Sequence, residues 1–279
     1  MKIEYMPSRL GSNLLLWISS LIYADHNNIK IEYNIDSLIY GYNIFTTPIL
    51  EYINQHNSNI NENTNAVNIS LNNDFYNFLS IVVLNIKSDV ISYFRSKLLE
   101  RIKPSLNNLF HKNNYTLCYD KDNTIVVHLR LDDVSERIDY DGKISSECYI
   151  NKINNDIPVH NSDLDYYINT QSPLSVDKIQ KQIDNALKIY KNYEVIIIAS
   201  SEPKDYVINL PYRIIRNNTP EYDLFLLCNA KVLILSRSTF ALMGCLLGNY
   251  EKAYVPLWGL FVGVGLGTKY DNTNLSYFY

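Results

Sequence analysis

Glycine and proline are scarce in this chain, and a strong charge of either sign is missing. Nine glycines and nine prolines occur among 279 residues, while asparagine, isoleucine, tyrosine and lysine are abundant. This bias is typical of coding by an AT-rich genome, viral or bacterial, and indicates no particular chemistry. The formal net charge of −4 disfavours a protein that coats nucleic acid, because such proteins gain affinity from clustered lysine and arginine.

Metal-binding, disulfide and membrane-spanning patterns are missing as well. The four cysteines, Cys118, Cys148, Cys228 and Cys245, include no CxxC pair, so neither a zinc site nor a disulfide framework is predicted. The apolar run at 14–18 is too short to span a bilayer, and residues 1–5 lack the layout of a signal peptide. We therefore expect no transmembrane segment and a cytoplasmic location, the host cytoplasm for a viral protein.

The hydrophobic content of 47% is sufficient for two compact domains. From residue 124 onward, strands predicted at 125–127, 194–199, 212–215 and 231–235 alternate with helices predicted at 176–190, 222–229 and 240–247. This alternation indicates an α/β fold with a parallel sheet. Earlier in the chain we expect a helix at 13–24, a strand at 29–33, a surface loop within 54–73, and helices at 74–84 and 90–102, the last ended by Pro104.

His128 and Arg130 follow the apolar run 124–127, which has the pattern of a buried strand. In open α/β sheets, ligands bind beyond the carboxyl ends of the strands, and an arginine there can hold a phosphate through two parallel hydrogen bonds. An arginine after a strand is also common as a solvated loop residue. A second cluster about a hundred residues later favours the functional interpretation.

In that second cluster, the predicted strand 231–235 ends in a turn with Ser236 and Ser238, and a helix begins with Thr239 and Phe240. It ends near Gly248. Backbone N–H groups and hydroxyls at a helix start can bind an anion. The structural alternatives are a helix cap for Ser238 or Thr239 and a core position for Phe240.

Together these segments resemble the fucosyltransferases that share a GDP-binding half, namely the α-1,2-, α-1,6- and protein O-fucosyltransferases. The matches to the HxRxxD motif of the α-1,2 group are His128, Arg130 and Asp133. The matches to the later SxSTF segment are Ser236, Ser238, Thr239, Phe240 and Gly244. Asp223 matches an aspartate that the family carries on the helix before this segment. Gly11 and Asn13 belong to a stretch that resembles a reduced form of the family's Gly-rich N-terminal loop. The chain departs from the α-1,2 pattern at Leu131, where a second arginine is usual, and at Leu242 and Met243, where tryptophans are usual.

The resemblance implies a GT-B-like α/β fold in which two Rossmann-like domains face a cleft. It implies a glycosyltransferase that moves fucose from GDP-fucose to a glycan hydroxyl with inversion, without a metal or another cofactor. We expect an acceptor-side domain at 1–118 and a GDP-sugar-binding domain at 119–260. The tail at 261–279 is expected to pack back on the first domain.

The resemblance also implies roles for individual residues. Arg130 would stabilise the charge on the departing β-phosphate, and Asp133 is the candidate general base. The remaining residues expected to bind the donor are Gly11, Asn13, His128, Asp223, Ser236, Ser238, Thr239 and Phe240. Within this set, Asp223 would accept from the N1–H and N2–H₂ groups of guanine, while Ser238 and Thr239 would hold phosphate oxygens.

Other interpretations of the sequence remain open. A transferase for another GDP-hexose would keep the nucleotide site, and a non-catalytic GDP-sugar-binding protein would keep the fold without turnover. A GxGxG pattern at 263–267 is typical of dinucleotide-dependent dehydrogenases, although no βαβ unit is expected after it. Asp163 and Asp165 form a DxD pattern that could hold a metal, but it follows no clear strand. Asp132 and Glu202 are further carboxylates near strand ends.

Overall fold

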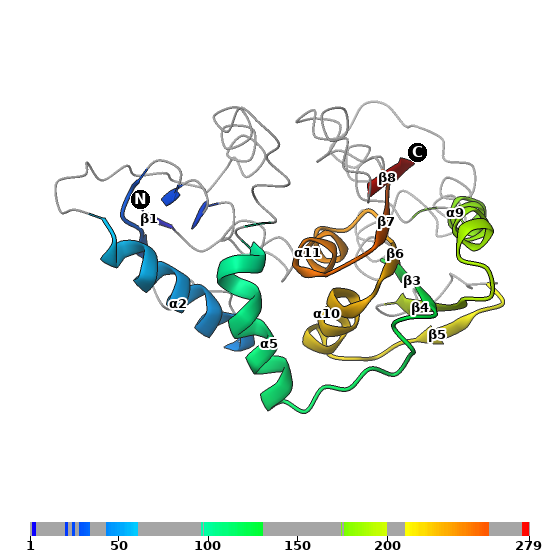
Figure 1. Cartoon of the computed structure of the whole chain (residues 1–279), viewed down its shortest axis with the longest axis horizontal. Helices are drawn as coiled ribbons and strands as arrows, with labels where there is room; N and C mark the ends of the chain where they lie inside the picture. The colour runs from blue at the N-terminus through cyan, green and yellow to red at the C-terminus, as the bar shows by residue number, and fades with distance from the viewer. Residues whose placement is uncertain are drawn as a thin grey trace, which may run out of the picture. The chain divides into compact units, whose positions relative to one another are not determined.

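A computed structural model describes residues 2–3, 20–21, 24–25, 28–33, 43–60, 96, 98–130, 174, 176–199, 210–256 and 275–278. The chain divides into two compact units, Met1–Thr116 and Leu117–Tyr279, and each is described by itself (Figure 1). Within the described ranges, no helix is long and apolar enough to cross a membrane.

The described part of unit 1 consists of helices and a pair of short parallel strands. Strand β1 (Lys2–Ile3) pairs with β2 (Glu32–Tyr33). The helices are α2 (Asn43–Ser58), the π-helix η2 (Leu98–Ile102) and α5 (Lys103–Lys112). The predicted stop at Pro104 is wrong, because Pro104 stands in the first turn of α5, where its missing N–H has no helical partner to lose.

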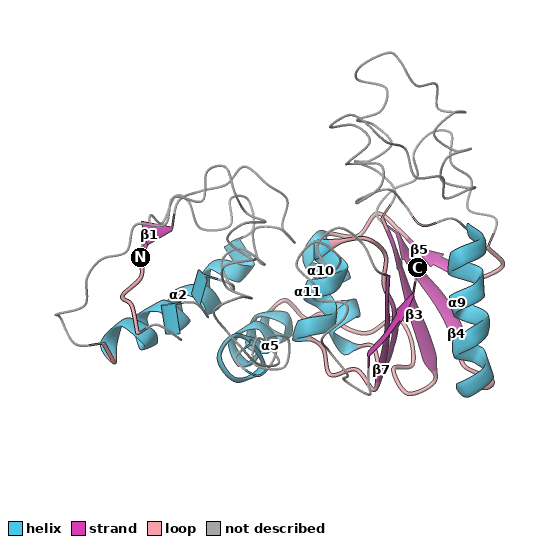
Figure 2. Ribbon diagram, turned by 90° about the horizontal axis from the view of Figure 1, so that it is seen from above, coloured by secondary structure: helices cyan, strands magenta, loops and turns pink. Residues whose placement is uncertain are grey.

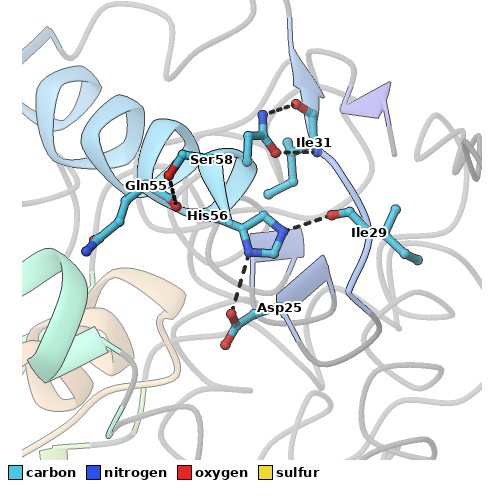
Figure 3. A network of polar contacts seen from close by, with 7 residues as sticks. Asp25, Ile29, Ile31, Gln55, His56 and Ser58 are labelled. Atoms are coloured by element: carbon cyan, nitrogen blue, oxygen red, sulfur yellow. Dashed lines mark hydrogen bonds and ion pairs between the residues drawn. The ribbon is translucent and has the colours of Figure 1, made fainter. Parts of the chain in front are cut away.

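The last turn of α2 corrects the loop predicted from residue 54, since residues 54–58 are helical. Its polar side chains bind the segment before β2 (Figure 3). The Nε2 atom of His56 lies 2.8 Å from the carbonyl oxygen of Ile29, and Nδ1 lies 3.5 Å from Asp25. The Asn57 amide donates to the Ile31 carbonyl and accepts from the Ile31 N–H, both at 2.9 Å. The polar residues at the end of α2 therefore form hydrogen bonds within unit 1.

Unit 2 contains a six-stranded sheet in which every neighbouring pair is parallel. Its strands are β3 (Thr124–Leu129), β4 (Glu194–Ala199), β5 (Arg213–Ile215), β6 (Val232–Ile234), β7 (Lys252–Pro256) and β8 (Leu275–Phe278). They lie in the order β5-β4-β3-β6-β7-β8. The α/β class with a parallel sheet, predicted from the alternation of elements, is confirmed.

This order places the first strand of unit 2 in the middle of the sheet. The chain runs outward from β3 to β4 and β5, returns across the sheet to β6, and continues outward to β7 and β8. The same order occurs in Rossmann-like nucleotide-binding folds, and their ligands bind where the direction reverses, at the carboxyl ends of the strands. Here the reversal lies between β3 and β6.

Helices cover both faces of the sheet, as Figure 2 shows: α9 (Val176–Ile189) lies on one face, while α10 (Pro220–Asn229) and α11 (Thr239–Leu247) lie on the other. Ile125, Val127 and Leu129 belong to the apolar cluster that includes Ile179 and Ile183 of α9. Because side chains alternate along a strand, His128 is on the α10 and α11 face.

Helices α10 and α11 pack closely because α11 has a glycine at the contact. A Cβ atom added to Gly244 would lie 2.5 Å from the Cβ of Leu227 on α10. Buried Tyr119, before β3, donates its hydroxyl to the carbonyl oxygen of Leu226 at 2.6 Å. These two contacts therefore hold α10 against α11 and against the segment that precedes β3.

The end of the tail, which was expected to pack on the first domain, belongs to the sheet of unit 2. Residues 275–278 form β8, which pairs in parallel with β7 in the sheet of unit 2. Ladder hydrogen bonds satisfy the backbone of such a segment more completely than surface packing does. The GxGxG pattern at 263–267 lies outside the described residues.

Candidate functional site

The candidate site lies at the reversal of strand order, where β3 and β6 end side by side. Val127 of β3 is level with Ile234 of β6 in the sheet register. His128 and Arg130 therefore reach the same edge as Ser236 and Ser238, although the two segments are far apart in the sequence. The structure thus brings together the two motifs that were identified separately.

A buried hydrogen bond joins the two segments. The Nδ1 atom of His128 lies 2.7 Å from Oγ of Ser236, and the two residues are 5% and 3% exposed. Burying two polar side chains is favourable only when they are paired. This bond therefore fixes the end of β3 against the turn after β6.

His128 is a neutral group in this position. Burial in the core, together with the positive charge of Arg130, lowers the pKa of His128 to about 3. A neutral imidazole has one donor and one acceptor nitrogen, so the bond with Ser236 at Nδ1 sets the role of Nε2. The fixed positive charge at this strand end belongs to Arg130, which is half-buried directly after β3.

The first turn of α11 lies next to the His128 ring. The Phe240 ring is tilted by 41° to the imidazole, with 5.8 Å between ring centroids. Ser238 is the N-cap of α11, where its Oγ accepts from the N–H of Ala241 at 3.4 Å, and Thr239 is the first helical residue. The capping role weighed for Ser238 is confirmed. A capping hydroxyl keeps its own O–H to donate, so this role is compatible with anion binding.

Asp223 lies in the first turn of α10, which begins at the carboxyl edge because it follows β5. Its Oδ1 atom accepts from the Nδ2 group of Asn218 at 2.8 Å. Thr219 is the N-cap of this helix. An aspartate in a first helical turn is favoured by the helix dipole.

Two further arginines at the same edge were missed by the sequence interpretation. Arg216 directly follows β5, and Arg237 stands between Ser236 and Ser238; both are half-buried. The signal that identified Arg130, an arginine directly after an apolar strand, applies equally to Arg216. Together with Arg130 they give this edge of unit 2 a positive character suited to a phosphorylated ligand.

Several predicted residues lie outside the described residues, namely Gly11, Asn13, Asp132, Asp133, Asp163, Asp165 and Glu202. Within the described part of the chain, no group of three or more His, Cys, Asp or Glu side chains could hold a metal ion. Cys228 and Cys245 are buried and Cys118 is exposed, and none of these three cysteines is part of a disulfide.

Comparison with known proteins adds no relative to this description. No protein-family model matches the chain, and no curated protein matches it at a significant level. The functional interpretation therefore rests on the geometry of the β3 and β6 strand ends and on the motifs that they carry.

Proposed function

We propose that the chain is a GDP-sugar-dependent glycosyltransferase that moves fucose from GDP-fucose to a glycan hydroxyl with inversion and without a metal. The observation that carries this proposal is the buried bond between His128 and Ser236. It joins an HxR segment and an SxSTF segment at the position where Rossmann-like sheets bind nucleotides. The proposal includes a GT-B-like architecture in which unit 1 supplies the acceptor side.

The chemistry follows from the leaving group. Breaking the bond between sugar and β-phosphate develops negative charge on the phosphate oxygens, and a guanidinium aimed there stabilises the transition state more than the ground state. Arg130 would carry that role. The hydroxyls of Ser238 and Thr239, with the N–H groups of the first turn of α11, would hold the other phosphate oxygens.

His128 would orient the nucleotide and not move a proton. Its low pKa makes it a poor general base at neutral pH, since a base with a pKa near the working pH is most effective. The proton of the acceptor hydroxyl would pass to a carboxylate, for which Asp133 is our candidate. Phe240, beside His128, would pack against the base or the ribose.

A dinucleotide-dependent dehydrogenase is the second candidate, because the strand order of unit 2 is also that of dinucleotide-binding folds. Those folds carry a glycine-rich turn directly after the first strand, which lets the pyrophosphate approach the backbone. Here the first strand of the sheet is β3, and the residues that follow it are Arg130, Leu131, Asp132 and Asp133. An arginine in place of a glycine directly after this strand favours phosphate binding by a side-chain cation.

The test is a thermal-shift panel of GDP, GDP-fucose, UDP and ADP, each with and without EDTA. We expect GDP and GDP-fucose to stabilise the protein, by about 2.7 kcal/mol at about a hundred times the dissociation constant. EDTA should leave that stabilisation and the transfer of fucose intact. Equal stabilisation by UDP would remove the guanine assignment, and a strict need for manganese or magnesium would favour a metal site at Asp163 and Asp165.

Arg130→Lys tests the catalytic assignment, because lysine keeps the charge and loses the planar fork. We expect this variant to retain its melting temperature and most of its GDP binding, and to lose on the order of a hundredfold in turnover. Arg130→Ala should lose more. Near wild-type transfer by both variants would show that Arg130 is not the cation of this reaction.

A further inference from the structure

The short segment between β5 and α10 holds a carboxylate in place. Asn217 has a positive φ of 60° and turns the chain away from β5. The next residue, Asn218, donates from Nδ2 to Oδ1 of Asp223 at 2.8 Å. Thr219 then caps α10, where its Oγ1 accepts from the N–H of Tyr222 at 3.3 Å.

Helix capping does not account for the bond between Asn218 and Asp223. Thr219 already binds a backbone N–H of the first turn, whereas the Asn218 bond joins two side chains and satisfies no backbone group. The helix dipole favours a carboxylate at Asp223 whether or not Asn218 is present. The direct effect of the Asn218 amide is to restrain the orientation of the Asp223 carboxylate.

This carboxylate lies at the same edge of unit 2 as the phosphate-binding motifs. Both α10 and α11 begin at the carboxyl edge of the sheet, because each follows a strand, and they pack against each other where Gly244 meets Leu227. Phe240 on α11 and Asp223 on α10 each lie four residues, about one helical turn, before this contact. Phe240 is the ring beside His128.

We propose that Asn218 is a positioning residue that sets base selectivity by holding the Asp223 carboxylate against the hydrogen-bonding edge of guanine. The inference rests on the proposed function, from which the GDP donor is taken. Guanine presents N1–H and N2–H₂ as two neighbouring donors, and both can reach one carboxylate only when the carboxylate lies in the plane of the base. An ionised carboxylate has about four acceptor positions, so a bond from Asn218 is compatible with bonds from the base.

The experiment measures the affinities of GDP, inosine diphosphate and ADP by calorimetry. Inosine diphosphate differs from GDP only in lacking the 2-amino group, so the ratio of the two affinities reports the second hydrogen bond. The wild type should prefer GDP by about tenfold or more, which is the usual discrimination of a two-point contact. In Asn218→Ala the ratio should fall to about twofold, while the melting temperature stays near that of the wild type.

Two further variants separate positioning from a structural role. Asn218→Asp has the same shape but replaces the donor with a second negative charge, so it should also lose the preference for GDP. The matched control is Thr219→Ala, which removes the neighbouring cap; it should lower the melting temperature and keep the wild-type ratio.

The outcomes distinguish this inference from the proposed function. If Asn218→Ala and Asn218→Asp keep a wild-type ratio of GDP to inosine diphosphate, Asn218 does not position the base-reading carboxylate, and the GDP site stands. If the wild type binds ADP as tightly as GDP, the guanine assignment fails and the inference fails with it.

Discussion

At the scale of single residues, the site depends on a histidine that stays neutral. His128 is almost fully buried, and its hydrogen bond with Ser236 joins two strand ends. Protonating it would place a second positive charge beside Arg130 in a region with little solvent. The residue therefore contributes a fixed pair of hydrogen-bonding nitrogens, and the positive charge at this strand end comes from the arginine.

The buried histidine predicts how stability depends on pH. The pKa of His128 falls from 6.5 to about 3 on folding, so the unfolded chain binds a proton that the folded chain excludes. The contribution is fully present above about pH 6.5 and is lost as the pH falls toward about 3, at roughly 1.4 kcal/mol per pH unit. Denaturant titrations of the wild type and His128→Asn between pH 7 and pH 4 should show a smaller loss in the variant.

The controls for this prediction are chosen by burial. Asparagine places an amide where Nδ1 of His128 lies, so it can keep the bond with Ser236 while it removes the titrating ring. His111, exposed on α5, provides the comparison variant His111→Asn, which should behave as the wild type does. Equal pH dependence in wild type and His128→Asn would contradict the buried, neutral histidine.

Asparagine occupies the left-handed positions at several described turns, where glycine is the usual residue. Among the described residues, the non-glycine positions with positive φ are Asn28, Asn114, Asn192 and Asn217, with φ from 54° to 69°. The left-handed region is costly for residues with a Cβ, but asparagine is tolerated there because its side chain can bond locally. At these four described positions, the chain therefore adopts the left-handed conformation with asparagine, a residue that is abundant in its composition.

We predict opposite effects of alanine at two exposed asparagines. Asn192 lies in the turn between α9 and β4 with a φ of 69°, so Asn192→Ala should destabilise unit 2 by about 1 kcal/mol, while Asn192→Gly should not. The matched control is Asn108, exposed within α5, where alanine is the better helix former and should stabilise by about 0.5 kcal/mol. Chemical denaturation of each variant measures both; a loss in Asn192→Gly as large as in Asn192→Ala would contradict the backbone explanation.

At the scale of elements, the close contact of α10 with α11 determines where the first turn of α11 stands. Gly244 matches the glycine of the SxSTF segment, and its observed role is to admit Leu227. Gly244→Ala would place two Cβ atoms 2.5 Å apart, so one helix must move. We expect a loss of about 1 to 3 kcal/mol in unfolding free energy and weaker GDP binding, measured by denaturation and calorimetry.

The geometry also predicts that a simple rescue fails. The nearest atom to the added methyl is the Cβ of Leu227, which alanine retains. The double variant with Gly244→Ala and Leu227→Ala should therefore remain destabilised. Recovery of wild-type stability in the double variant would show that the contact is made by the outer leucine atoms.

Local patterns predicted the elements of unit 2 that carry their own signals. The strand at 194–199 agrees with β4, and the helices at 222–229 and 240–247 agree with α10 and α11 within two residues. Apolar runs, a Thr or Ser cap and a final glycine identify such elements. Strands β7 and β8 were missed, because each is defined by pairing with its neighbour in the sheet, which no local pattern reports.

The candidate site was predicted only in part for the same reason. Each motif could be located at a strand end from its own residues, but the distance between His128 and Ser236 depends on the strand order of the whole sheet. That order is fixed by crossovers and nonlocal packing, which no local pattern reports. The bond from Asn218 to Asp223 was accessible in principle, since the two residues lie five apart around a helix start.

At the scale of the whole molecule, the chain divides into two compact units. Every candidate residue that the structure describes belongs to unit 2, from His128 to Phe240. The described helices of unit 1 have a different kind of organisation, in which polar side chains of α2 bind the segment before β2. The described residues expected to bind the nucleotide therefore belong to one unit, while Gly11 and Asn13 of unit 1 lie outside the described residues.

Hydrogen exchange of the full chain can measure this division. A ligand that binds only the folded state adds to the free energy of opening of the unit that holds it. With GDP at about a hundred times its dissociation constant, exchange in peptides that cover β3, the start of α10 and the start of α11 should slow by up to about a hundredfold. Peptides from α2 and α5 should exchange as they do without ligand.

EDTA should change neither result, because the proposed phosphate contacts come from Arg130 and the first turn of α11. Equal protection of α2 would place the nucleotide in contact with unit 1 or couple the two units, and protection of unit 1 alone would move the site out of the sheet at β3 and β6.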